Sequence, residues 1–264
     1  VEWLWEDMSD DTQYSGLQRL CSIDMLYCSK RNREMMVTQL PMSLIETAKR
    51  TIILSYLFKG SVMESFLKLK GVDVKDFTEV ELMKDSLEVR TKARELITLC
   101  SSPATNTVRN YSMSSTWYST TATKEQLKKL SAAIRSIYRK HGKTDILITL
   151  PKDSASKDSK RSVVHPNINI EDMFLYCGAR ATNDYASKSV AVHAYNRYVN
   201  LVVKSYLQDY GLELDAIPDD DLFALSEMIQ WIWRTRIRQD QPIELYILPR
   251  RMEQLFKDWL YSDD

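Results

Sequence analysis

The chain has 264 residues, of which 44% are hydrophobic and 27% are charged, a composition typical of a globular protein with a real core. Lysine plus arginine and aspartate plus glutamate number 36 each, so net charge alone indicates no nucleic-acid partner, although a local basic patch remains possible. No apolar run approaches the roughly 20 residues of a membrane helix, and no signal peptide is present. We therefore expect a cytoplasmic protein with no membrane partner. Because the first residue is Val1 rather than Met, we expect a fragment or a processed piece.

The four cysteines are dispersed, and none forms a C-x-x-C pair. With only three scattered histidines, this pattern excludes the common zinc arrangements, so we predict no metal site. The cysteines are interpreted as buried thiols in a reducing compartment. His193 lies in an apolar stretch that we expect to be helical, where it is interpreted as a packed core residue.

The first hundred residues are predicted to be mainly helical. Residues 51–58 (TIILSYLF) form an apolar run with β-branched residues, which predicts a buried strand. A helix should follow, with Ser61 as its N-cap and Glu64 as its capping-box partner. Residues 74–100 predict another helix or helix pair, so the range 1–100 is interpreted as a helical segment with the end of a first lobe.

Residues 101–123 differ in composition, because twelve of the 23 are serine or threonine. This bias predicts a linker or a long crossing loop. A disordered insertion and a functional hinge are both open for this range.

From residue 124 onward, strand patterns alternate with helix patterns. This alternation predicts the α/β class, with a parallel sheet flanked by helices, over 124–264. Thr123 is the expected cap and Gly142 the expected stop of the first helix. Strands are predicted over 145–150, 173–177 and 243–248, helices over 124–141, 186–209 and 250–261, and a polar loop over 151–167.

The segment 219–240 (DDDLFALSEMIQWIWRTRIRQD) predicts one further helix, because three aspartates suit a helix start. At about 100° per residue, one stripe is apolar and should face the core. The opposite stripe carries Gln230, Arg234 and Arg238, spaced four apart. Three residues in register on one face indicate either a solvated polar surface or a way of presenting charge to a ligand. The apolar stripe consists of Leu222, Leu225, Ile229 and Ile232.

The order of these elements resembles the second RecA-like lobe of a superfamily-two (DEAD/DEAH-like) helicase. The segment 230–238 (QWIWRTRIR) resembles the sixth helicase motif, a glutamine followed by spaced arginines. The resemblance implies that Arg234 and Arg238 act as catalytic arginine fingers on the γ-phosphate and that Gln230 contacts the nucleotide. This chain departs from the motif at Trp233, where glycine is usual, and its last arginine stands one residue later than usual.

The segment 178–184 (GARATND) resembles the fifth helicase motif, which touches the nucleic-acid backbone. The resemblance implies phosphate contacts from Arg180, Thr182 and Asn183, with Lys188 and Arg197 as further cations downstream. The residues alone are equally consistent with an ordinary strand-to-helix turn capped by Asn183 or Asp184. The resemblance is best over 142–260 and fair over 30–75, and it is similar in detail to helicase-like proteins of phages and mobile elements.

The parts that hold nucleotide in such helicases are missing from this sequence. It contains no G-x-x-x-x-G-K-[ST] phosphate loop and no metal-holding Asp-Glu pair. The resemblance therefore implies that ATP and Mg²⁺ are bound mainly by an N-terminal ATPase lobe or subunit outside this chain, with DNA or RNA as a further partner. The alternative is a non-enzymatic nucleic-acid- or protein-binding module that kept a degenerate helicase-like fold.

Overall fold

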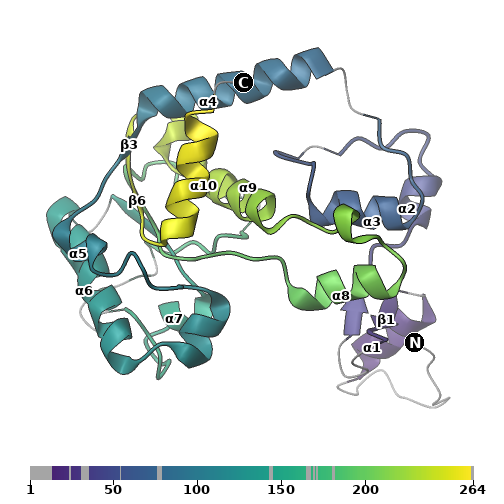
Figure 1. Ribbon diagram of the computed structural model, residues 1–264, viewed down its shortest axis with the longest axis horizontal. Coiled ribbons are helices and arrows are strands. Elements are labelled where there is room, and N and C mark those ends of the chain that lie inside the picture. Colours follow the sequence, from purple (N-terminus) through teal and green to yellow (C-terminus); the bar gives the residue numbers. More distant parts are fainter. Residues whose placement is uncertain are drawn as a thin grey trace. The chain divides into compact units, whose positions relative to one another are not determined.

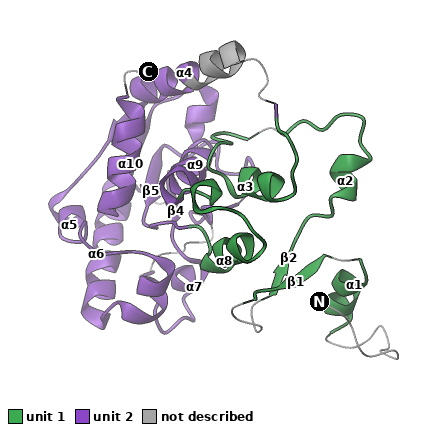
Figure 2. Ribbon diagram, turned by 45° about the vertical axis from the view of Figure 1, so that its right-hand side comes forward, with its two compact units in different colours: residues 1–74, 199–219 green, residues 75–198, 220–264 purple. Residues whose placement is uncertain are grey.

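The computed structural model describes residues 14–23, 25–30, 36–53, 55–75, 79–142, 145–164, 168, 170, 172–179 and 182–262. The chain divides into two compact units (Figure 2). Unit 1 comprises residues 1–74 and 199–219, and unit 2 comprises residues 75–198 and 220–264. These boundaries differ from the predicted ranges, because residues 75–123 belong to the same unit as the sheet.

Unit 1 consists of short helices and one two-stranded antiparallel ladder, in which β1 pairs with β2. The predicted cap of α3 is present, because the Ser61 side chain accepts a hydrogen bond from the Glu64 backbone N–H. Glu64 reaches back to the Gly60 N–H rather than to that of Ser61. The elements of unit 1 are α1 (Ser15–Ser22), β1 (Leu26–Cys28), β2 (Met36–Thr38), α2 (Ser43–Glu46), α3 (Val62–Leu69), α8 (Leu201–Asp209) and the 3₁₀ turn η2 (Leu214–Ala216).

The strand predicted over residues 51–58 is wrong. Residues 51–53 are exposed and irregular, and Leu57 has a φ of 52°, which takes the chain out of the extended conformation. An apolar run with β-branched residues becomes a strand only where another strand offers it hydrogen bonds.

Unit 2 is built on a four-stranded parallel sheet with the order β3-β6-β5-β4. Every residue of β4 and β5 is buried, as expected for parallel strands covered on both faces. The predicted α/β class, with a parallel sheet flanked by helices, is confirmed. The strands are β3 (Ile97–Leu99), β4 (Ile146–Thr149), β5 (Val190–His193) and β6 (Ile243–Ile247).

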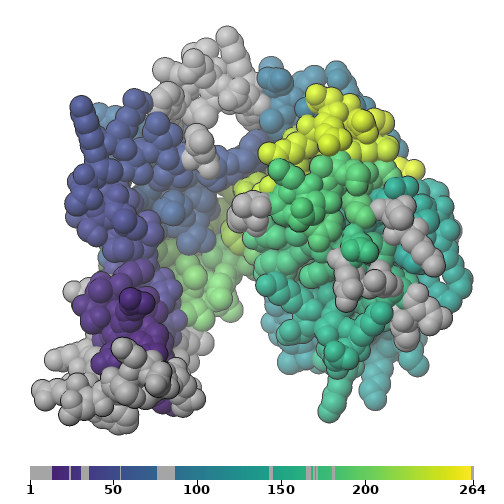
Figure 3. Space-filling model, turned by 180° about the vertical axis from the view of Figure 1, so that it is seen from behind, coloured from purple at the N-terminus to yellow at the C-terminus, as the bar shows by residue number. Residues whose placement is uncertain are grey.

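Helices cover both faces of this sheet. Glu244 and Tyr246 of β6 meet the end of α6 (Lys124–His141), since Lys140 Nζ lies 3.0 Å from Tyr246 Oη. The alternate strand positions face α9 (Asp220–Ile232), whose Trp231 ring stacks edge-on against His193. Helix α10 (Arg250–Leu260) contacts α9, β6 and α4 (Glu79–Leu96). Figure 1 shows α10 beside α9, and Figure 3 shows it in yellow against the green part of unit 2.

The helix predicted over 186–209 is wrong over its first half. Residues 190–193 form strand β5, and α8 begins only after Asn200, whose side chain accepts a hydrogen bond from the Val202 N–H. The β-branched Val190 and Val192 suit a strand, and pairing with β4 on one side and β6 on the other decides the outcome.

The range 101–123 is not a linker. It forms α5 (Pro103–Asn106) and the π-helical turn η1 (Trp117–Thr121), and it buries the side chains of Val108, Met113 and Tyr118. The hydroxyl groups of this segment serve local caps, such as the capping box between Ser102 and Thr105.

Two smaller predictions also differ from the structure. Residues 173–177 contribute a single bridge, Ile148 to Phe174, instead of a third strand. The predicted loop over 151–167 contains a short helix, α7 (Lys152–Ala155). The helix over 124–141 is confirmed, with Thr123 as its cap and Gly142 at its end with a φ of 82°.

Candidate functional site

The two arginines of the predicted sixth motif do not share a helix face. Helix α9 ends at Ile232, and the chain continues into the 3₁₀ turn η3 (Arg236–Gln239). Thr235 and Ile237 are both fully buried, and the Thr235 hydroxyl donates to the Ile232 carbonyl at 2.7 Å. Drawing these two side chains into the core unwinds the helix before the arginines are placed. Of the apolar stripe, Leu225, Ile229 and Ile232 are buried, whereas Leu222 is 38% exposed.

Both arginines nevertheless reach the turn that resembles the fifth motif. Arg234 Nη1 donates to the Thr182 carbonyl at 3.2 Å, and Arg238 Nη1 donates to Asn183 Oδ1 at 2.5 Å. The Arg236 N–H bonds to the carbonyl of Lys188, two residues before β5, so this site lies at the amino edge of the sheet. The structure thus brings together segments more than fifty residues apart that the resemblance had placed in one site.

The turn itself is ordered by Thr182 and Asp184. The Thr182 hydroxyl donates to Asp184 Oδ2 at 2.8 Å and accepts from the Asp184 N–H at 3.3 Å. Its proton is therefore not available to a phosphate oxygen. Because Arg238 can only donate, it fixes the Asn183 carbonyl oxygen toward itself and leaves the amide NH₂ as a donor for another group.

The alternative of a strand-to-helix turn capped by Asn183 or Asp184 is wrong, since β5 follows this turn and no helix does. Arg180 lies outside the described residues. Gln230 is half-buried, and its amide donates to Ser226 Oγ within α9, so its contact with nucleotide stays a prediction.

The two further cations expected downstream of the turn do not face solvent. Lys188 is only 8% exposed. Arg197 is buried and forms an ion pair with Glu227 at 3.3 Å, while it donates to the Tyr176 hydroxyl at 2.6 Å. Their expected contribution to a phosphate-binding surface is therefore wrong.

Arg197 instead organises the interior beside the turn. Its guanidinium lies over the rings of Tyr176, Tyr195 and Phe223 at 5.2 to 5.4 Å from their centroids. Gly178 packs closely here, because a Cβ on it would lie 3.0 Å from the Tyr176 ring and 3.2 Å from the Glu227 carboxylate. The start of the 178–184 turn is thereby held against α9 and the end of β5.

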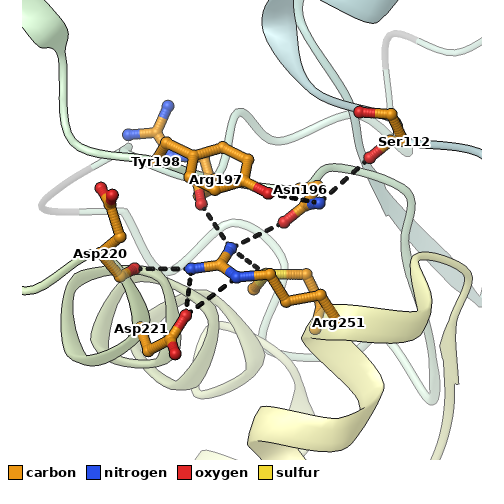
Figure 4. Close-up of polar contacts among 8 residues, drawn as sticks. Ser112, Asn196, Arg197, Tyr198, Asp220, Asp221 and Arg251 are labelled. Carbon is orange, nitrogen blue, oxygen red and sulfur yellow. Dashed lines mark hydrogen bonds and ion pairs between the residues drawn. The ribbon is translucent and has the colours of Figure 1, made fainter.

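A second arginine cluster, which the sequence did not reveal, lies at the carboxyl edge of the sheet (Figure 4). Arg251 Nη1 donates to Asn196 Oδ1 and to the Arg197 carbonyl, each at 2.8 Å. Its other nitrogens bond to the Asp220 carbonyl and to the Asp221 carboxylate, and its guanidinium lies 4.3 Å from the centre of the Tyr198 ring. Because all its donors are used within the protein, we interpret Arg251 as structural.

A third polar cluster surrounds Cys100 beside β6. The thiol donates to Glu244 Oε2 at 3.3 Å, and burial together with that carboxylate raises the thiol pKa. A protonated thiol is a poor nucleophile and a poor metal ligand. Among the described residues, no group of three or more His, Cys, Asp or Glu side chains is arranged to hold a metal ion.

Parallel strands covered by helices on both faces, with polar clusters at both edges, define a Rossmann-like α/β domain. Residues 91–260 match the family described as the YonV C-terminal Rossmann-like domain, and the chain belongs to this family. The chain is 29% identical over 243 residues to the SPbeta prophage-derived uncharacterized protein YonV of Bacillus subtilis (strain 168).

That match covers 87% of this chain and 56% of the relative, so the chain spans little more than half of the relative's length. No solved structure shows a significant match. In the described part of the chain, no helix has the length and apolar character needed to cross a bilayer.

Proposed function

We propose that this chain supplies the second lobe of a nucleic-acid-dependent NTPase of the superfamily-two helicase type. ATP and Mg²⁺ are then bound mainly by a first lobe that the 264 residues do not contain, because the phosphate loop and the Asp-Glu pair are absent from the sequence. The observation that carries this proposal is the pairing of Arg234 and Arg238 with the 182–183 turn.

The contacts favour different roles for the two arginines. Arg238 is exposed and uses one nitrogen on Asn183, so the rest of its planar fork is open to a phosphate group. Arg234 is half-buried and bonds to a backbone carbonyl. In this proposal Arg238 is the arginine finger, and Arg234 is a positioning residue that holds the turn.

Asn183 connects the two ligands of the proposed lobe. Its NH₂ group is the donor for a nucleic-acid phosphate, and its carbonyl oxygen holds Arg238. A strand that pulls on Asn183 therefore shifts the arginine that faces the nucleotide, which is one route by which nucleic acid stimulates hydrolysis.

The experiment is NTP hydrolysis by the natural protein that carries this chain, with and without single-stranded nucleic acid. Arg238→Ala should lower kcat by about 10³-fold, the size of known finger effects, and Arg238→Lys should remain impaired because lysine lacks the fork. Arg250→Ala, which removes an exposed arginine from the start of α10, is the matched control. The isolated 264-residue chain should show no turnover.

Wild-type turnover by the Arg238→Ala protein would contradict the proposal. Arg234→Ala separates the two roles, since loss of a positioning residue should lower the melting temperature of the protein as well as kcat. Nucleic-acid-stimulated hydrolysis by the isolated chain would also contradict it, because the chain would then hold its own phosphate site.

A further inference from the structure

The outer face of α6 forms one wall of a basic groove, far along the sequence from the 182–183 turn. Three cations of α6 line it, together with two serines, an alanine and one residue of the 156–164 loop. The volume of this α6 groove is about 440 Å³. The lining residues are Lys128, Ser131, Ala132, Arg135, Ser136, Arg139 and Val164.

The charges inside the α6 groove are not neutralised by the protein. Other cations of the same helix have partners: Lys129 pairs with Glu125 at 2.8 Å, and Lys140 pairs with Glu244 at 3.3 Å. No carboxylate is among the groove-lining residues, and none of the ion pairs found within the described chain involves the three groove cations. The helix therefore separates paired cations from unpaired ones, and the unpaired ones share the groove.

The opposite wall is held in place by Arg161. Its guanidinium donates to the carbonyls of Tyr118 at 2.5 Å and Ala122 at 2.7 Å, which lie just before the start of α6. The loop is further fixed by the Val163 N–H bonding to the Ser154 carbonyl. Two more exposed lysines, Lys157 and Lys160, stand on this anchored loop.

We propose that the α6 groove binds the phosphodiester backbone of a single-stranded nucleic acid. The groove cations span about 16 Å of helix axis at 1.5 Å per residue, a length that suits a chain of phosphates better than one small anion. The serine hydroxyls add neutral donors between the charges. Choosing nucleic acid among polyanions rests on the proposed function, whereas the groove and its charges do not.

A single strand fits this surface better than a duplex. Helix α6 is seated on the sheet by buried side chains such as Leu130, Ile134 and Ile137, so it is not free to enter a major groove. A strand lying along α6 can meet the groove cations in turn. Such backbone contacts carry no sequence information and weaken with salt.

The test is fluorescence anisotropy of a labelled oligothymidylate with the 264-residue chain over a series of salt concentrations. The groove variant carries Lys128→Gln, Arg135→Gln and Arg139→Gln. The matched control carries Lys124→Gln, Lys129→Gln and Lys140→Gln, which removes the same charge from the same helix outside the groove. Glutamine is a good helix former, and circular dichroism verifies that both variants fold.

We expect the groove variant to lower the slope of log K against log salt by about 2, because each lost phosphate contact on a single strand removes roughly 0.7. The control variant should keep the wild-type slope. Equal losses in both variants, or no loss in the groove variant, would overturn the proposal. If the triple variant does not fold, Arg139→Gln near the exposed helix end should still lower the slope by about 0.7.

Two competitors identify the ligand. Tighter binding of a duplex of equal length, or equal binding of polyglutamate, would overturn the assignment to single strands. The variant Asn183→Ala distinguishes the two surfaces: loss at Asn183 alone leaves the proposed function standing without the groove. If the wild-type chain binds no oligonucleotide, the groove proposal fails, and the hydrolysis assay still decides the proposed function.

Discussion

At the scale of single residues, buried polar groups in unit 2 carry the sharpest consequences. Arg197 and Glu227 are both removed from water, so each depends on the other for compensation. The sequence did not reveal this pair, because positions 197 and 227 come together only when β5 and α9 pack. Local pattern suggested the opposite, an exposed cation beside the 178–184 turn.

His193 predicts a pH dependence of stability. Its side chain is fully buried in β5, and burial, aided by the charge of Arg197, lowers its pKa to about 3. The core position was predicted correctly, whereas the helix around it was not. Between this value and the unfolded pKa of about 6.5, the unfolded chain binds one more proton, so stability falls as pH falls.

We expect His193 to make the free energy of unfolding about 2 kcal/mol lower at pH 5 than at pH 7. His193→Gln cannot take up this proton, so its pH dependence should be weaker than that of the wild type by this amount. Urea unfolding of both proteins at the two pH values measures the difference. Parallel pH profiles would show that His193 is not neutral in the folded state for the reason given.

At the scale of elements, short signals within one element were predictable and partner-dependent ones were not. Helix α6 was predicted with its cap because Thr123 and Gln126 bond within three residues of each other. The end of α9 was missed because the burial of Thr235 and Ile237, a tertiary effect, overrides a helical pattern that continues through Arg238. Strand β5 was missed for the same kind of reason.

Arg251 connects three elements of unit 2, and we expect its loss to be costly. It joins the residues after β5, the start of α9 and the start of α10, at the points where the chain leaves unit 2 and returns to it. Arg251→Ala should lower the free energy of unfolding by about 2 kcal/mol, with the exposed part of the Asp221 pair contributing little.

Hydrogen exchange locates the effect of this substitution. In Arg251→Ala, amides of residues 194–198 and 220–224 should exchange faster than in the wild type, while β4 should be unaffected. The neighbouring Arg250→Ala is the control, since Arg250 is exposed. The interpretation of Arg251 as a structural connector fails if both variants unfold and exchange alike.

At the scale of the whole molecule, a net charge of zero conceals a strong local separation of charge. The α6 groove gathers unpaired cations, whereas Asp219, Asp220 and Asp221 gather acids at the start of α9. The class of the fold was predictable from alternating strand and helix patterns. The division into two units was not, because residues 199–219 belong with residues 1–74 and no local signal marks that exchange.

The central claim is that the 182–184 turn and the 234–238 segment form one ligand-facing site at the amino edge of the sheet. The most direct measurement is hydrogen exchange of the 264-residue chain with and without a single-stranded oligonucleotide at low salt. We predict that the amides of 182–188 and 234–241 become protected together, and that Arg238→Ala removes protection from both. Protection confined to α6 and the 156–164 loop, with the turn and the arginine segment unchanged, would contradict the account.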